Sequence, residues 1–475
     1  MLQIEEASFP LVEPLPGEPD AARLFEILCR HPKCLYLDSA QREPHLGRYS
    51  FLAVDPVMWI ESPADGSDAL AHLAGVMRTW QGRVVPDLPP FQGGIAGLFG
   101  YGLTHSLERV PQCRWDEFRH PAIAVGCYDV VIAIDHELRQ GWIISQGLPE
   151  HDPVRRQQRA QARMQQMQQW LAAGPVHRDT ARPLQVPPLP REQLAPQYAV
   201  SRRPHLTSNL SPDQYCAMVQ RGIDYIHAGD VFQVNLSQRL LHPAQDDAVS
   251  LYLRMRQRNP APFAAYIDGG PWQILSSSPE RFLRVSAGHV EARPIKGTRP
   301  RTSQPVADLF SASALRDSEK DRAENVMIVD LLRNDLSRVC RPESVCVTQL
   351  CQVETYSFVQ HLVSSVEGEL GPGQNVIDLL RGAFPGGSIT GAPKVRAMEI
   401  IAELEPTARG SYCGCLGYLG LDGSMDLNIL IRTVTASHGW WQIPVGGGIV
   451  AQSKPRQEYQ ETWDKAEGIL RALDL

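Results

Sequence analysis

Hydrophobic residues recur at helical spacing in several stretches of the chain. Residues 20–29, 153–172 and 211–228 each carry an apolar stripe flanked by polar positions. Asp20 and Ser211 stand where a helix N-cap is expected, and a proline follows Ser211 directly. The spacing therefore predicts three amphipathic helices. The middle one is rich in Arg and Gln, so we expect it to be largely exposed.

Other stretches show the pattern of β-strands. Segments 34–39, 122–134 and 426–435 are each predicted as a strand because apolar residues run through them. Segment 230–239 alternates strictly, with the side chains of Gln233, Asn235 and Ser237 on one face. A polar strand face usually meets water, and the alternative is that these residues form the wall of a cleft.

Composition separates two parts of the chain and excludes some functions. Prolines crowd residues 174–204, so we place a linker there, between an N-terminal region, 1–205, and a second domain, 206–475. The 475 residues carry 53 acidic and 46 basic side chains, a net charge of −7, which argues against a nucleic-acid partner. Neither a membrane-spanning apolar run nor a signal peptide is found. The ten cysteines form no C-x-x-C pair and are predicted to be reduced cytoplasmic thiols.

Two predicted helices carry acidic residues on one face. Asp321 and Glu324 share a face of the helix near 318–335, and Glu458, Glu461 and Lys465 share a face of the helix near 457–470. If the two faces met, their oxygens would suit Mg²⁺. The alternative is ordinary solvated helix surface with a Glu461–Lys465 ion pair.

Three further features suggest anion binding. Arg432 lies among aliphatic residues, and a buried Arg needs an anionic partner, either an internal carboxylate or a ligand. Glycine clusters at 385–394 and 445–449 could present backbone N–H groups to an anion, or be simple tight turns. His361 stands alone in an apolar strand, where a core role is the commoner one.

Together these segments resemble the chorismate-utilising enzymes, which include the anthranilate, aminodeoxychorismate, isochorismate and salicylate synthases. The resemblance covers nearly the whole chain. It rests on five motifs in family order: Gly-Asp-Val-Phe-Gln-Val-Asn-Leu (229–236), Ser-Ser-Pro-Glu-Arg-Phe (277–282), Asp-Leu-Leu-Arg-Asn-Asp (330–335), Gly-Gly-Ser-Ile-Thr-Gly-Ala-Pro-Lys (386–394) and Gly-Gly-Gly-Ile-Val (446–450). It implies an α+β fold with two packed antiparallel sheets and helices outside.

Two residues place the chain within the family. Anthranilate synthases have Ala where Lys296 stands, and isochorismate and salicylate synthases have a water-activating Lys where Gln233 stands. Lys296 with Gln233 is the pattern of the aminodeoxychorismate synthases. It implies amination of chorismate at C4, with ammonia from a separate glutamine amidotransferase subunit. Anthranilate synthesis and a catalytically silent, tryptophan-binding sensor are the alternatives.

The resemblance also implies roles for individual residues. Glu280 matches the general acid and Lys296 the nucleophile. Mg²⁺ ligands are matched by Glu324 and Glu461, with Glu458 in a second tier. The residues that match substrate-binding positions are Gln233, Gly297, Thr298, His361, Ser388, Tyr412, Arg432, Gly446, Gly447, Gly448 and Lys465.

The N-terminal region resembles the family's tryptophan-binding segment. Ser39 stands at the matching position, and Tyr49, Pro262 and Phe263 would line the same pocket. Asp38 departs from the usual Glu of the regulated synthases, and an amphipathic edge strand is the alternative.

Overall fold

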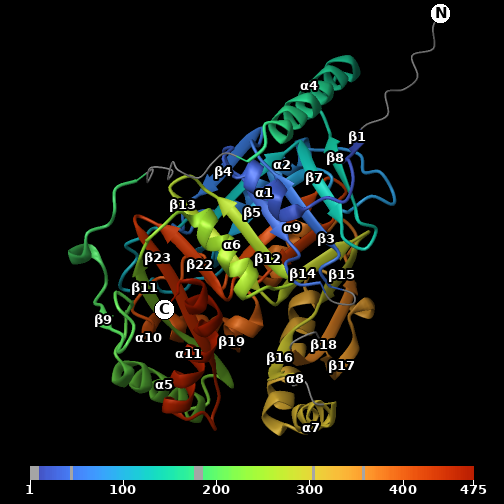
Figure 1. Cartoon of the computed structure of the whole chain (residues 1–475). Coiled ribbons are helices and arrows are strands. Elements are labelled where there is room, and N and C mark those ends of the chain that lie inside the picture. The colour runs from blue at the N-terminus through green and yellow to red at the C-terminus, as the bar shows by residue number, and fades with distance from the viewer. Residues whose placement is uncertain (1–9, 43–45, 176–185, 302–304, 356–358, 475) are drawn as a thin grey trace, which may run out of the picture.

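Two antiparallel sheets form the body of the protein in a computed structural model (Figure 1). The structure describes residues 10–42, 46–175, 186–301, 305–355 and 359–474. Apolar side chains from both sheets, among them Phe51, Leu98 and Ile274, pack into a shared core. The predicted α+β fold with two packed sheets is therefore confirmed.

The larger sheet has 13 strands. In spatial order they are β1 (Leu11–Pro14), β8 (Gln140–Ser145), β7 (Val130–Asp135), β3 (Tyr49–Ala53), β2 (Leu35–Asp38), β12 (Phe263–Asp268), β13 (Trp272–Ser278), β22 (Thr433–Ser437), β23 (Trp440–Ile449), β11 (Gln233–Pro243), β10 (Thr207–Ser208) and β9 (Tyr198–Ala199), with β19 (Gly391–Ala392) paired to β11.

The second sheet has ten strands. They are β16 (Ile295–Pro300), β18 (Val359–Glu369), β15 (His289–Ala292), β14 (Arg281–Ser286), β21 (Met425–Asn428), β20 (Cys415–Gly420), β5 (Gly94–Phe99), β6 (Ile123–Tyr128) and β4 (Met58–Ser62), with β17 (Cys346–Thr355) paired to β18.

Helices surround the two sheets (Figure 1). They are α1 (Ala21–Leu28), α2 (Ala69–Thr79), α3 (Thr104–Leu107), α4 (Pro153–Ala172), α5 (Pro212–His227), α6 (Ala248–Arg258), α7 (Pro305–Arg316), α8 (Glu319–Ser337), α9 (Val376–Ala383), α10 (Lys394–Leu404) and α11 (Pro455–Ala472), with short 3₁₀ turns η1 (Tyr101–Leu103), η2 (Arg191–Gln193), η3 (Pro342–Ser344) and η4 (Gly387–Ile389). The three helices predicted from spacing are α1, α4 and α5, and the caps Asp20 and Ser211 are as expected.

Two predicted strands are each split between the sheets. Segment 122–134 forms β6 in the second sheet and β7 in the first, with buried Asp129 between them. Segment 426–435 likewise forms β21 and β22, and Arg432 lies at the crossing with a φ of 50°. The prediction of single strands was wrong because the apolar pattern continues while the backbone changes direction.

A third crossing joins β13 to β14 and contains Glu280. Two residues with predicted roles, Glu280 and Arg432, therefore lie where the chain passes between the sheets. The two crossings touch, since the Ile429 N–H donates to the Glu280 carbonyl at 3.0 Å.

Strand β11 departs from the expectation for 230–239. It begins at Gln233, and Phe232 just before it is 73% exposed. The polar face does not meet water, because Gln233 and Ser237 are buried. This face is the wall of a cavity, and the solvated-surface interpretation was wrong.

Strands from residues 1–205 extend both sheets of the second part. β2 pairs with β12, and β5 pairs with β20. The exact boundary near 205 stays a prediction, but hydrogen-bonded strands join the two parts.

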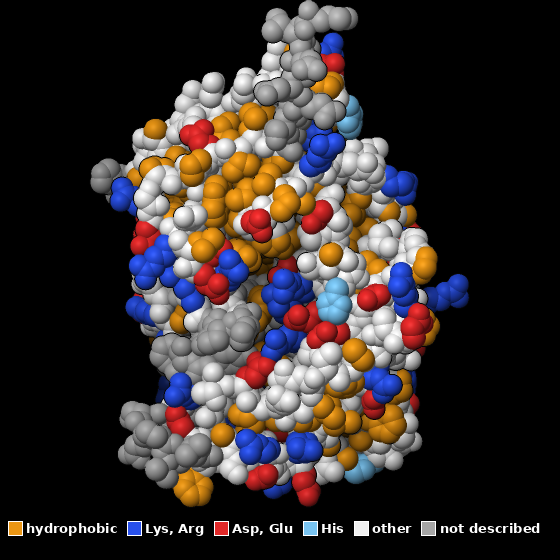
Figure 2. Space-filling model, turned by 90° about the vertical axis from the view of Figure 1, so that its right-hand side faces the viewer, with side chains coloured by type: hydrophobic (Ala, Val, Ile, Leu, Met, Phe, Trp, Pro, Cys, Tyr) orange, Lys and Arg blue, Asp and Glu red, His pale blue; other side chains and the backbone are white. Residues whose placement is uncertain are grey.

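The surface agrees with the charge balance of the sequence. Figure 2 shows one face on which Lys, Arg, Asp and Glu mix across the middle, with hydrophobic side chains above and below. This face is therefore not the basic surface that nucleic acid would require. In the described residues, no helix is both long and apolar enough to cross a membrane. All ten cysteines lie in the described part, where each is a free thiol.

Candidate active site

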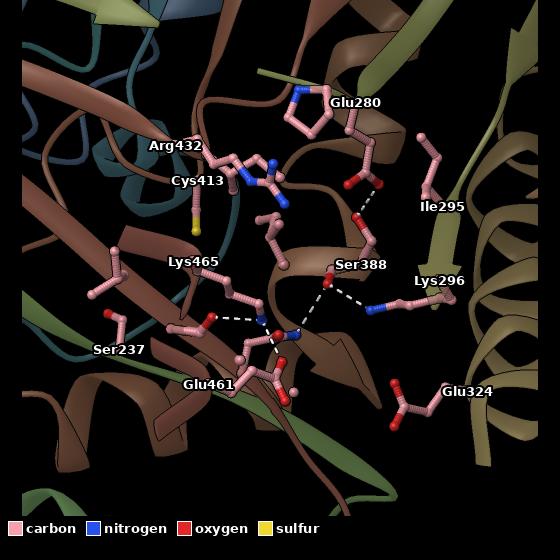
Figure 3. Close-up of a pocket in the computed structure, with 18 of the residues that line it drawn as sticks. Ser237, Glu280, Ile295, Lys296, Glu324, Ser388, Cys413, Arg432, Glu461 and Lys465 are labelled. Carbon is pink, nitrogen blue, oxygen red and sulfur yellow. Dashed lines mark hydrogen bonds and ion pairs between the residues drawn. The ribbon is translucent and has the colours of Figure 1, made fainter. Parts of the chain in front are cut away.

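A cavity of about 560 Å³ opens between β11 and β23 on one side and β16 and α8 on the other (Figure 3). It gathers most of the predicted site residues, which come from distant parts of the chain. They are Glu280, Lys296, Gly297, Glu324, His361, Ser388, Tyr412, Arg432, Gly446, Gly447, Gly448, Glu461 and Lys465.

Ser388 connects the predicted acid to the predicted nucleophile. Its hydroxyl donates to the Glu280 carboxylate at 2.9 Å, and its carbonyl accepts from the Lys296 ammonium at 3.3 Å. Both side chains point toward this residue from different elements (Figure 3). A general acid and an amine are thus held on either side of one small polar residue.

Burial of Glu280 favours the protonated form that a general acid needs. The side chain is only 7% exposed, and burial raises its pKa, although Lys296 and the Ser388 hydrogen bond act in the other direction. A raised pKa increases the protonated fraction near neutral pH, which is what a proton donor needs.

Two arginines lie close to Lys296 in the sequence, Arg293 and Arg299. A neutral amine at Lys296 would be favoured either by burial or by positive charge of this kind. Arg293 forms an ion pair with Glu354, and Arg299 lies 3.4 Å from Asp321. Both charges are therefore compensated by carboxylates within the protein.

Arg432 is the arginine of the predicted anion site, and it lines the cavity. In the part of the chain that the structure describes, no acidic side chain lies within ion-pair distance of its guanidinium, although the residue is largely buried. Of the two partners that the sequence left open, an internal carboxylate is therefore excluded within the described residues. The neighbouring Tyr412 is 7% exposed and lines the same region. The arrangement suits a carboxylate on a ligand.

The acidic faces of α8 and α11 meet at the other end of the cavity. Lys320, which the sequence did not single out, lies 3.9 Å from Glu324 and 3.8 Å from Glu458 and so bridges the two helices. The Lys320 ammonium thus lies between a carboxylate of α8 and a carboxylate of α11. No group of three potential metal ligands converges among the described residues, however.

The three acids differ in their ionisation. Burial raises the pKa of Glu324 and of Glu458, and Glu458 accepts a hydrogen bond from Ser453 at 2.7 Å. Burial acts the same way on Glu461, but Lys465 and Lys320 outweigh it, so its pKa lies below the usual value. Burial thus disfavours the charged forms of Glu324 and Glu458, and a cation bound between them would offset that cost.

Lys465 supports the glycine edge of the cavity. Its ammonium lies 2.7 Å from Glu461 and donates to the Gly446 carbonyl at 2.9 Å. A Cβ at Gly447 would come within 3.4 Å of both Lys465 and Glu461. The glycines of β23 therefore leave room for these charged groups beside the strand.

His361 lies on β18, opposite Thr298 of β16, and lines the cavity near Lys296. Burial lowers the pKa of His361 to about 4, so the imidazole is neutral at pH 7 and hydrogen-bonds the Gly297 backbone. Thr298 pairs with His361 across the strands, but its side chain lies outside the described part.

Gly297 should not tolerate a side chain. Its φ is +66°, and a Cβ would lie 2.6 Å from Leu315 Cδ1. We expect Gly297→Ala to lower the free energy of unfolding by about 3 kcal/mol, from backbone strain plus overpacking. Urea unfolding measures this. Gly288→Ala is the control, because Gly288 has a φ of +79° with nothing within 4 Å, and strain alone costs about 1 kcal/mol there. Equal losses of unfolding free energy in Gly297→Ala and Gly288→Ala would show that packing against Leu315 adds nothing to the backbone strain.

Gln233 lies behind the cavity surface. Its side chain is fully buried, and neither amide atom has a hydrogen-bond partner among the described residues. The amide reaches Gly448, where an added Cβ would sit 2.7 Å from its nitrogen. Its substrate-binding role stays a prediction.

A buried ion pair beneath the site was not foreseen from the sequence. Arg409 and Glu405 are 3% and 4% exposed and 2.7 Å apart. Arg409 donates to the carbonyls of Ile389 and Asn235, and Glu405 accepts from Ser237. The pair thus fixes β11 against the Ser388 turn. The i,i+4 spacing was the available signal, but it is common on exposed helices.

The residues of the predicted tryptophan site lie at one end of three neighbouring strands. Ser39 follows β2, whereas Tyr49 and Phe263 begin β3 and β12. The Ser39 hydroxyl donates to the Tyr49 carbonyl at 2.5 Å. Tryptophan binding by Ser39, Tyr49, Pro262 and Phe263 stays a prediction.

Titration calorimetry of the chain with L-tryptophan should show saturable heat if this pocket binds the amino acid. A titration without heat of binding would contradict the prediction.

Comparison with known proteins places the chain in a family. Residues 32–471 match the model of the chorismate binding enzymes. A Salmonella typhimurium protein named aminodeoxychorismate synthase component 1 is 40% identical over 98% of both chains. A Thermus thermophilus protein named anthranilate synthase component 1 is 40% identical over 82% of this chain and 79% of its own.

A solved structure supports the same assignment. Anthranilate synthase component I from Streptococcus pneumoniae superposes with a TM-score of 0.72 at 30% identity, covering 89% of this chain and 92% of the other. The chain belongs to the chorismate binding enzymes.

Proposed function

We propose that the chain is component I of an aminodeoxychorismate synthase, which converts chorismate and ammonia into 4-amino-4-deoxychorismate and water. The relative named aminodeoxychorismate synthase is 40% identical over 98% of this chain, and the one named anthranilate synthase is 40% identical over 82% of it. Coverage therefore favours the first name, although the percentage identity is the same. The observation that carries the choice is Lys296, whose ammonium lies in the cavity beside the residue that also binds Glu280.

The proposed reaction uses this pair in sequence. Glu280 protonates the C4 hydroxyl of chorismate, which leaves as water while Lys296 bonds to C2 and the ring double bonds shift. Ammonia then bonds to C4, the double bonds shift back, and the C2–nitrogen bond to Lys296 breaks. While the lysine occupies C2, ammonia cannot add there, which would direct amination to C4.

The two carboxylates of chorismate would bind at opposite ends of the cavity. Arg432 and Tyr412 suit the enolpyruvyl carboxylate, because no described acidic side chain pairs with the guanidinium. Glu324 and Glu461, with Glu458 behind them, offer hard oxygen ligands for Mg²⁺, which would neutralise the ring carboxylate. Lys320 would have to move from between the helices to make room for the ion.

The proposed metal site can be tested by removing its ligands one at a time. Glu324→Ala and Glu461→Ala should each lower turnover at least 100-fold while the circular dichroism spectrum stays unchanged, because each removes one of few ligands. Glu467→Ala is the control, because Glu467 lies on the same helix but is 46% exposed, pairs with Arg203 and does not line the cavity. Chelation should abolish the activity of the unmodified chain, and Mg²⁺ should restore it. Activity that survives exhaustive chelation would rule the metal out.

Ammonia would come from a second subunit. The relatives are named component 1, which implies a second component in their enzymes. We propose that the corresponding partner here is a glutamine amidotransferase and that both act in the cytoplasm.

One assay tests the function. Purified chain, chorismate, Mg²⁺ and ammonium chloride should give a product that mass spectrometry identifies as 4-amino-4-deoxychorismate, with the enolpyruvyl group retained. Anthranilate with free pyruvate would support the alternative synthase instead. Unchanged chorismate with saturable tryptophan binding would support a silent sensor.

A further inference from the structure

A groove of about 860 Å³ lies outside the cavity, between α8, the start of α10 and the residue before β11. Three exposed apolar side chains line it. Phe232 is 73% exposed, Val326 40% and Val395 38%. Exposed apolar side chains gathered in one hollow are typical of a surface that another molecule covers.

The groove and the cavity share their walls. On α8, Asp321 and Glu324 line the cavity, whereas the intervening Arg322 and Ala323 line the groove. At the start of β11, Phe232 lines the groove and Asn235, three residues later, lines the cavity. A molecule seated in the groove would therefore lie beside the reacting groups.

Gln233 occupies the partition at β11. The Phe232 N–H donates to the Ala392 carbonyl at 2.7 Å, so Phe232 and Ala392 close the groove side, while Gly448 lines the cavity side. Between them lies the Gln233 amide, and neither of its polar atoms has a hydrogen-bond partner in the part of the chain that the structure describes. A buried amide without hydrogen-bond partners is costly, and such an amide can both donate to and accept from ammonia.

The charges at the rim complement an acidic partner. Arg381 and Lys394 are compensated by Asp68 and Asp335. Arg322 and Arg338 also line the groove, and no carboxylate lies within ion-pair distance of either among the described residues. Two acidic residues, Glu108 and Asp330, line the groove as well. Asp330 pairs with Arg333 at 3.2 Å, which leaves Glu108 against Arg322 and Arg338 and a small positive excess around the apolar side chains.

We infer that this groove is the docking surface of the ammonia-supplying amidotransferase subunit, with Phe232 as its anchor. The inference rests on the proposed function, which requires an ammonia source next to the cavity. The partner would place an apolar pocket over Phe232 and acidic side chains opposite Arg322 and Arg338. Ammonia released there would enter through the partition at Gln233. Anchors of this kind, aromatic and central in an apolar patch, carry much of the binding energy of an interface.

Phe232→Asp tests the anchor, and Phe310→Asp is its matched control. Phe310 is also 73% exposed but lies on α7, outside the groove. Each variant is mixed with the glutamine amidotransferase subunit purified from the same organism, and product is measured with glutamine or with ammonium chloride. Phe232→Asp should lose at least tenfold of the glutamine-driven rate while the ammonium-driven rate stays within twofold. Phe310→Asp should keep both rates.

The two rates separate failure of the inference from failure of the proposed function. If the unmodified chain makes no 4-amino-4-deoxychorismate from ammonium, the proposed function is wrong. If it does, and Phe232→Asp keeps the full glutamine-driven rate, the groove is not the docking surface. If Phe232→Asp loses both rates, Val326→Asp and Val395→Asp are measured instead. A full glutamine-driven rate in both would show that the groove is not the docking surface, and a tenfold loss of that rate alone would support it.

Binding and self-association provide an independent measurement. Surface plasmon resonance should show at least tenfold weaker binding of the amidotransferase subunit to Phe232→Asp than to Phe310→Asp. Equal binding would overturn the inference. So would a dimer of the unmodified chain in light scattering that Phe232→Asp converts to monomer, because a second copy would then cover the groove.

Discussion

Lys296→Ala should lower the rate of 4-amino-4-deoxychorismate formation by about 10³-fold or more, since a residue that forms a covalent intermediate is hard to replace. The cavity keeps Glu280 and its Ser388 hydrogen bond in this variant, so the C4 hydroxyl can still be protonated. With C2 no longer occupied, some ammonia should add there. We therefore expect a small yield of C2-aminated product, measured by mass spectrometry of the ammonium-driven reaction.

A lysine outside the site supplies the control. Lys454 is exposed at the start of α11, and Lys454→Ala should leave the rate unchanged. Wild-type turnover in Lys296→Ala would show that the amine is not the nucleophile. It would also remove the observation on which the choice between the two synthases depends.

Glu280→Gln should lower turnover by about 10²–10⁴-fold, because glutamine cannot protonate the departing hydroxyl. The amide has nearly the same shape and can still accept from Ser388, so chorismate binding should remain within a few-fold. Single-turnover kinetics with ammonium separates the two effects. Glu291→Gln is the control, because Glu291 is a partly buried glutamate that does not line the cavity. Weaker chorismate binding with unchanged turnover would mean that Glu280 positions the substrate instead.

The raised pKa of Glu280 gives this prediction a pH dependence. Burial penalises the carboxylate, so the protonated form persists above the usual pKa of a glutamic acid and is lost as pH rises through the raised value. Turnover of the unmodified enzyme should fall over the same range. The stability that the protonated form contributes is also lost there, so Glu280→Gln should unfold at higher urea concentration than the wild type at alkaline pH.

Local patterns predicted the elements that depend on neighbouring residues. The caps Asp20 and Ser211 and the stripe around Met164 determine α1, α5 and α4 through contacts within a few residues. The acidic faces of α8 and α11 followed from helical spacing in the same way. That these faces meet came from the family motifs, because no local pattern places two helices more than a hundred residues apart side by side.

The parts that were missed depend on distant contacts. Asp129 is buried because Arg163 from α4 pairs with it at 3.1 Å, which no pattern in 122–134 reveals. Arg299 likewise meets Asp321 only after β16 and α8 have packed together. Periodicity reports which residues are apolar, but it does not report where the backbone turns from one sheet to the other.

The pairing of β2 with β12 and of β5 with β20 has a consequence for truncation. A fragment that starts at residue 206 would retain β12 and β20, both largely buried, but would leave one long edge of each without its partner strand. Open apolar edges recruit other chains and promote aggregation. The proline-rich stretch is therefore a poor place to divide the protein, and a library that shuffles catalytic parts among chorismate enzymes should exchange whole chains.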